Sequence, residues 1–122
     1  MEEYKSKIIE LGTSVDEMSQ LGMLILFSND APSELRDYCI IHDNKQLLRD
    51  LKVNQKIYLG KDQYTISAIG NTALQQWQEL GHVTLRFDGE LTPQLPGTVH
   101  LNNKLKGIPK IGEFIKVEQE KS

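Results

Sequence analysis

The fold is decided by the stretch Lys56-Ile57-Tyr58-Leu59-Gly60-Lys61-Asp62-Gln63-Tyr64-Thr65-Ile66-Ser67-Ala68-Ile69. Its two apolar halves are rich in β-branched and aromatic residues, which favour strands. The three residues between the halves, Gly60-Lys61-Asp62, include the glycine that a short hairpin loop commonly uses. The stretch therefore predicts an antiparallel β-hairpin.

A second strand signal follows the hairpin. Apolar and polar side chains alternate along His82-Val83-Thr84-Leu85-Arg86-Phe87-Asp88, which is the period of a strand with one buried face. The inward set is Val83, Leu85 and Phe87, and the outward set is His82, Thr84, Arg86 and Asp88. Shorter apolar runs near residues 4–11, 23–27, 39–42, 97–101 and 114–117 are further strand candidates, and we expect six or seven short strands in all.

Helical periodicity is strong in one place. Thr72-Ala73-Leu74-Gln75 has the form of a capping box. An apolar stripe that includes Trp77 follows it, and Gly81 is placed to end the helix. Strands with glycine turns and one short helix predict an all-β domain, a barrel or a sandwich, and a closed barrel leaves no exposed sheet edge.

Composition limits the protein class. A length of 122 residues suits one domain, residues 1–122. The net charge of −3 argues against nucleic-acid binding, which draws on a basic surface. The single cysteine, Cys39, fits a reducing compartment. The first residues lack the apolar segment of a secretory signal, and the apolar run 23–27 is too short to span a bilayer. We therefore expect a soluble cytoplasmic protein without membrane insertion.

The chemistry depends on three histidines: His42, His82 and His100. His42 follows the apolar run Tyr38-Cys39-Ile40-Ile41 and precedes Asp43-Asn44-Lys45, which is typical of a turn. A histidine at the end of a rigid strand, reachable from solvent, suits a nucleophile or a proton carrier. The alternative is a structural histidine bonded to a backbone carbonyl.

The absence of known motifs argues against several enzyme classes. The chain has no G-x-S-x-G, no G-x-x-x-x-G-K-[ST] and no G-x-G-x-x-G, so hydrolase and nucleotide-binding functions lack support, and we expect no cofactor. The three histidines could supply a catalytic zinc site, but none of the short paired spacings of such sites occurs. Phosphoryl transfer through a phosphohistidine requires less: an attacking nitrogen, a partner for the other nitrogen, and donors that offset the phosphoryl charge.

Three segments carry a family resemblance. Leu80-Gly81-His82-Val83-Thr84-Leu85-Arg86-Phe87-Asp88-Gly89, Pro96-Gly97-Thr98-Val99-His100, and the region from Ala31-Pro32 to Ile41-His42 resemble the glucitol/sorbitol-specific IIA component of the bacterial phosphoenolpyruvate-dependent sugar phosphotransferase system. The resemblance runs from about Ile8 to Val117. It implies a small Greek-key β-barrel in which His42 is the phosphorylated nucleophile.

The same resemblance implies the partners. The phosphoryl group would come from the histidine phosphocarrier protein and pass to a cysteine on the IIB part of the membrane-bound IIB/IIC permease.

His82, on a polar face with Thr84, is a candidate to stabilise the phosphoryl oxygens, and Thr84 is a further candidate. We expect an apolar docking surface around His42, with residues 29–35 as its rim. A non-catalytic β-barrel interaction module is the alternative function, and a three-histidine zinc enzyme is a more distant one.

Overall fold

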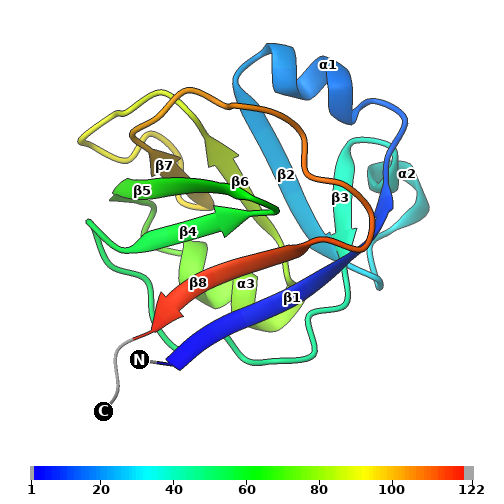
Figure 1. Cartoon of the computed structure of the whole chain (residues 1–122), viewed down its shortest axis with the longest axis horizontal. Coiled ribbons are helices and arrows are strands. Elements are labelled where there is room, and N and C mark those ends of the chain that lie inside the picture. The colour runs from blue at the N-terminus through cyan, green and yellow to red at the C-terminus, as the bar shows by residue number, and fades with distance from the viewer. Residues whose placement is uncertain (1, 120–122) are drawn as a thin grey trace.

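Eight strands form a closed barrel in the computed structural model, which describes residues 2–119 (Figure 1). The strands are β1 (Glu2–Leu11), β2 (Met23–Ser28), β3 (Cys39–His42), β4 (Lys56–Leu59), β5 (Asp62–Ile69), β6 (Val83–Arg86), β7 (Thr98–Leu101) and β8 (Phe114–Gln119). The all-β class and the barrel are confirmed, but the expected six or seven strands are too few.

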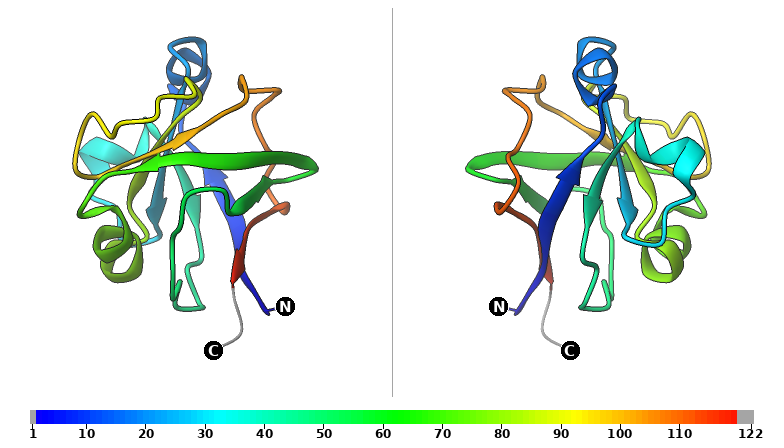
Figure 2. Two further views of the ribbon diagram at one scale, coloured as in Figure 1. Left: turned by 90° about the vertical axis from the view of Figure 1, so that its left-hand side faces the viewer. Right: turned by 90° about the vertical axis from the view of Figure 1, so that its right-hand side faces the viewer.

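Three short helices accompany the strands within the described residues, where one was expected: α1 (Val15–Gln20), α2 (Ser33–Arg36) and α3 (Ala73–Leu80). The first two have six and four residues, too short to show a sustained helical period in the sequence. Figure 2 shows α1 at one end of the barrel and α3 at the opposite end.

The strands follow the order β1-β3-β2-β6-β7-β5-β4-β8 around the barrel. Most neighbours are antiparallel, but β2 pairs with β3 and β6 pairs with β7 in parallel. The predicted hairpin is confirmed as β4 and β5, with Gly60 at φ 63° in the turn, but the loop has two residues instead of three because Asp62 already pairs with Leu59. The first strand β1 pairs with the last strand β8 as well as with β3, and this pairing closes the barrel.

The strand alternation places apolar side chains on both sides of the wall near β3. Inside, Leu24, Leu26 and Ile40 join the main core and are fully buried. Outside, a small cluster packs beside α2, made of Ile25, Phe27, Ala31, Cys39 and Ile41. The uninterrupted apolar run of β2 is therefore covered on both faces, as a strand without polar alternation requires.

Helix α3 closes one end of the barrel with Trp77, which is fully buried and meets the ring of Tyr4 edge-on at 5.7 Å between centroids. Gly81 ends the helix in the left-handed conformation at φ 64°, as predicted. The capping box is wrong: the side chain of Thr72 forms no capping hydrogen bond, and its Oγ1 is buried without a partner among the described residues.

Candidate functional site

His42 is the last residue of β3, and its side chain points into the barrel. Ile40 and His42 share the inner face because side chains alternate along a strand. The expectation that solvent reaches His42 is wrong: its exposed fraction is 0%. Strands β1 and β2 flank β3 on its two edges, and the turn between α3 and β6 lies against the ring.

Both ring nitrogens of His42 have a partner. Nε2 lies 2.8 Å from the carbonyl oxygen of Gly81, and Nδ1 lies 2.7 Å from Oγ of Ser6. A carbonyl oxygen can only accept, so Nε2 holds the proton and Nδ1 of the neutral ring accepts from the Ser6 hydroxyl. Burial lowers the pKa of His42, and the Gly81 hydrogen bond only partly opposes this effect. The resting ring is neutral at pH 7.

Ser6 on β1 connects His42 to the segment that follows it. Its Oγ accepts the backbone N–H of Asn44 at 2.8 Å and lies 3.1 Å from Oδ1 of Asp43. The same Asp43 oxygen accepts the backbone N–H of Lys7 at 3.1 Å. Asn44 adopts φ 46°, a left-handed conformation that asparagine tolerates better than most residues. These hydrogen bonds fasten the turn after β3 to β1.

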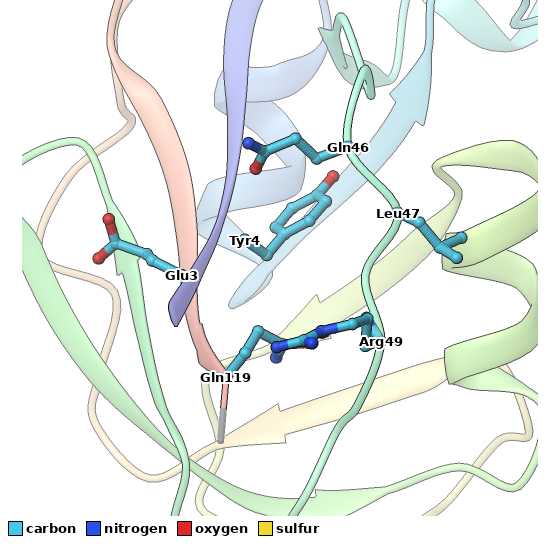
Figure 3. Close-up of a pocket in the computed structure, with 6 residues that line it drawn as sticks. All are labelled: Glu3, Tyr4, Gln46, Leu47, Arg49 and Gln119. Carbon is cyan, nitrogen blue, oxygen red and sulfur yellow. Dashed lines mark hydrogen bonds between the residues drawn. The ribbon is translucent and has the colours of Figure 1, made fainter. Parts of the chain in front are cut away.

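A second chain of hydrogen bonds supports this turn. Trp77 donates its indole N–H to the hydroxyl of Tyr4 at 3.1 Å, and Tyr4 donates to Oδ1 of Asn44 at 2.9 Å. Beside Tyr4 lies a hollow of about 360 Å³, lined by Glu3, Tyr4, Gln46, Leu47, Arg49 and Gln119 (Figure 3). His42 does not line this hollow, so its ring is separate from it.

His82 and Thr84 lie on the outer face of the barrel wall. The His82 ring stacks on Phe27, with centroids 4.4 Å apart and planes 15° apart. Burial lowers the pKa of His82. Thr84 pairs with Ile25 on one side and Thr98 on the other. The imidazoles of His82 and His42 lie on opposite faces of the wall. The two residues are nevertheless linked, because His82 directly follows Gly81, whose carbonyl binds Nε2 of His42.

His100 belongs to a different part of the barrel. It is fully buried on β7, opposite Arg86 of β6. Its Nδ1–H donates to Asp88 at 2.8 Å, and its Nε2 accepts the backbone N–H of Gln94 at 3.3 Å. His100 therefore fastens the loop before β7. No group of three or more His, Cys, Asp or Glu within residues 2–119 is arranged to hold a metal ion, so the three-histidine zinc site does not form.

Sequence reasoning missed Ser6 and Gly81. Ser6 is one polar residue on a strand that also carries Lys5 and Lys7, and only the inward position of β1 distinguishes it. Gly81 contributes a carbonyl group, which every residue has. The one signal at Gly81 is its place at the end of the predicted helix, since a glycine there allows the backbone to approach a neighbouring element closely.

Comparison with known proteins shows the family of this chain. The family model of the PTS system glucitol/sorbitol-specific IIA component matches residues 3–116. The chain belongs to this family. The glucitol/sorbitol-specific EIIA components of Shigella flexneri and Escherichia coli K12 are each 36% identical over 118 residues, which cover 97% of this chain and 96% of theirs.

The fold of this IIA chain has a solved counterpart. The crystal structure of a PTS system IIA component from Enterococcus faecalis V583 superposes with a TM-score of 0.74 at 20% identity, covering 94% of this chain and 98% of that one. In this IIA family member, no helix within residues 2–119 is long and apolar enough to cross a membrane.

Proposed function

We propose that this IIA component is a cytoplasmic phosphohistidine relay protein. It accepts a phosphoryl group from the histidine phosphocarrier protein on His42 and passes it to the IIB cysteine of a glucitol/sorbitol permease. The observation that carries the proposal is the setting of His42: in a chain of this family, it is a neutral imidazole at a strand end, with each nitrogen on a separate fixed partner. Such a ring is oriented before any phosphoryl donor arrives.

The phosphoryl group bonds to Nε2 in this proposal. The Nδ1 side is closed by Ser6 in the middle of β1, a strand paired along both edges. The partner on the Nε2 side is the carbonyl of Gly81, in the two-residue connection between α3 and β6. Moving a connection disrupts fewer hydrogen bonds than moving a wall strand. Displacement of residues 81–82 is therefore the step that exposes Nε2.

His82 and Thr84 enter the proposal through that displacement. Because His82 is bonded to Gly81, a movement that frees Nε2 also moves His82 away from Phe27. His82 is then the imidazole next to the incoming phosphoryl oxygens and serves as their donor. Thr84, two residues further along the same face, is the second candidate donor. Phosphoryl transfer kinetics that are unchanged in both directions in a His82→Gln variant would remove His82 from this role.

The docking surface extends over the segments that adjoin His42. Ser28, the β2 neighbour of His42, leads directly into residues 29–35, and Leu35 in this segment is 42% exposed. Leu80, the last residue of α3, is 47% exposed and immediately precedes the connection that closes the site. A partner that touches these two leucines therefore also touches that connection.

Charged substitutions test this docking surface. Leu35→Glu and Leu80→Glu are each expected to slow transfer from the phosphocarrier protein, because a carboxylate disfavours an apolar contact. Ile111 is 61% exposed and lies in the turn before β8, a segment that Figure 2 shows on the opposite side of the barrel from α2 and α3. Its variant Ile111→Glu is the matched control and should transfer at the wild-type rate. Equal rates in all three variants would contradict this docking surface.

The test of the relay is intact-mass analysis after incubation with phosphoenolpyruvate, the first enzyme of the system and the phosphocarrier protein. Wild type, His82→Ala and His100→Ala should each gain one acid-labile phosphoryl group, and His42→Ala should gain none. Because His42 is buried, the variant could lose its fold, so tandem mass spectrometry must also locate the group on His42 in the wild type.

The opposite result identifies the alternative. If authentic partners add no phosphoryl group to the folded wild type, His42 is a structural histidine and the chain is a non-catalytic interaction module. The hydrogen bonds to Ser6 and Gly81 are then only structural. A phosphoryl group found on His82 or His100 would equally overturn the assignment of His42.

A further inference from the structure

A phosphoryl relay through Nε2 creates a charge problem inside the barrel. When the lone pair of Nε2 forms the N–P bond, the donor's own N–P bond breaks and its electron pair stays on the donor. The other ring nitrogen, Nδ1, must carry a proton during this attack, since a neutral imidazole has one protonated and one free nitrogen. The ring thereby becomes cationic, and burial disfavours a cation without a partner.

We propose that the hydroxyl of Ser6 is a positioning group that links Nδ1 of His42 to the carboxylate of Asp43 and so keeps a proton on Nδ1 while Nε2 carries the phosphoryl group. This inference rests on the proposed relay function. The three atoms are already in place: Oγ of Ser6 lies 2.7 Å from Nδ1 and 3.1 Å from Oδ1 of Asp43.

The hydrogen-bonding capacity of one hydroxyl fits both states of the ring. A serine hydroxyl has one hydrogen and two lone pairs. In the resting state, Ser6 accepts from the N–H of Asn44 and donates to Nδ1. In the loaded state, it accepts from Asn44 and from Nδ1–H, and its hydrogen turns to Asp43. Only the hydroxyl rotates, and no heavy atom of the Ser6 side chain needs to move.

Proton balance holds across this change. To enter the reactive state, the ring gains one proton at Nδ1 from solvent and loses the Nε2 proton to solvent when residues 81–82 move aside. During the transfer itself no proton moves: Nδ1–H stays, one N–P bond forms and one breaks. On delivery to the acceptor thiolate, the N–P bond of His42 breaks and its electron pair returns to Nε2. A ring with a protonated Nδ1 leaves as a neutral imidazole, which is a better leaving group than the imidazolate that a ring without this proton would form.

The surroundings point to Asp43 as the charge that acts on the ring. Among the described residues, β1 presents Ser6 and the neutral hydroxyl of Tyr4 to this region, and β2 presents the neutral Ser28. The connection after α3 presents a backbone carbonyl, with His82 beyond it on the outer face. On α2, Arg36 is paired with Glu10 on the outside of the barrel. Asp43 itself is held by the backbone N–H of Lys7.

The experiment measures the protonation of Nδ1 directly. Histidine-¹⁵N-labelled protein is phosphorylated through phosphoenolpyruvate, the first enzyme and the phosphocarrier protein, and the Nδ1 resonance of phosphorylated His42 is followed against pH. We expect Ser6→Ala and Asp43→Asn each to reduce the proton affinity of Nδ1 about tenfold, so that its midpoint falls by about one pH unit. Ser6→Thr keeps the hydroxyl and should restore the wild-type midpoint.

The matched control is Ser28→Ala, which removes a buried hydroxyl from the other strand beside β3, where Oγ of Ser28 accepts the N–H of Asp30. This variant should keep the wild-type midpoint. If Ser6→Ala does not fold, Asp43→Asn decides the question, since it changes one charge on a partly exposed residue. Phosphorylated variants with wild-type midpoints overturn the role of Ser6 alone, whereas a wild type that accepts no phosphoryl group overturns the relay function on which it rests.

Discussion

Replacing Gly81 with alanine tests how tightly the connection after α3 closes over the site. Gly81 has φ 64°, and a Cβ placed on it would lie 3.0 Å from both Cβ and N of Ser28 and 3.1 Å from Cε1 of His42. A left-handed backbone costs a residue with a side chain about 1 kcal/mol, and overpacking a filled site adds about 1–3 kcal/mol. Gly81→Ala should therefore lower the free energy of unfolding by about 2–4 kcal/mol.

A second glycine separates the two contributions. Gly22 has φ 80°, and a Cβ placed on it meets nothing within 4 Å. Gly22→Ala therefore has the backbone strain without the contacts, and it should cost about 1 kcal/mol. The difference between the two variants isolates the contact of residue 81 with Ser28 and His42.

The assay is urea unfolding followed by circular dichroism. With a slope of about 2 kcal/mol per molar urea, a difference of about 2 kcal/mol moves the midpoint by about 1 M, well outside the error of the measurement. Gly81→Ala and Gly22→Ala with equal midpoints would refute the tight closure over His42, and with it the need to displace residues 81–82.

Three further predictions concern protonation and packing. Burial lowers the pKa of His42, and of His82, below the ordinary value of about 6.5. Because the unfolded chain then binds protons that the folded protein does not, the urea midpoint should decrease when the pH is lowered from 7 to 5. A His42→Asn variant whose midpoint decreases equally steeply would contradict this. Burial raises the pKa of the Cys39 thiol to about 11, so a thiol reagent at pH 8 should label the unfolded chain and not the native one, and rapid native labelling would count against it. Trp77→Phe removes the N–H that binds Tyr4 and should cost about 1 kcal/mol in urea unfolding, an idea that an unchanged midpoint would exclude.

Local sequence patterns predicted the elements that local forces determine. The hairpin of β4 and β5 has apolar halves and a glycine turn that need no distant partner to be recognised. The alternation of β6 correctly separated Val83 and Leu85 from the half-buried Thr84, because the period of a strand is built into its backbone. Gly81 ended α3 as expected, since its φ is positive.

The site was harder to predict because its contacts join distant parts of the chain. Ser6 and His42 meet only because β1 pairs antiparallel with β3, a register that no spacing in the sequence reveals. The partner of Nε2 of His42 is the carbonyl of Gly81, a backbone group that has no sequence signature. His82 was correctly assigned to the polar face of its strand, but that face lies outside the wall, whereas His42 points inward.

The pairing of β1 with β8 has a consequence for synthesis. Lys5 pairs with Lys116, and Ser6 with Ile115, so the strand that holds Ser6 against His42 is itself held by β8, which is made after all the other described strands. At about 5–20 residues per second, the ribosome delivers β8 on the order of ten seconds after β3. Until then β1 has an open edge, and the barrel cannot close. The nascent chain therefore cannot complete the His42 site, and a C-terminal truncation that removes β8 should leave a protein with His42 present but its Ser6 partner unfixed.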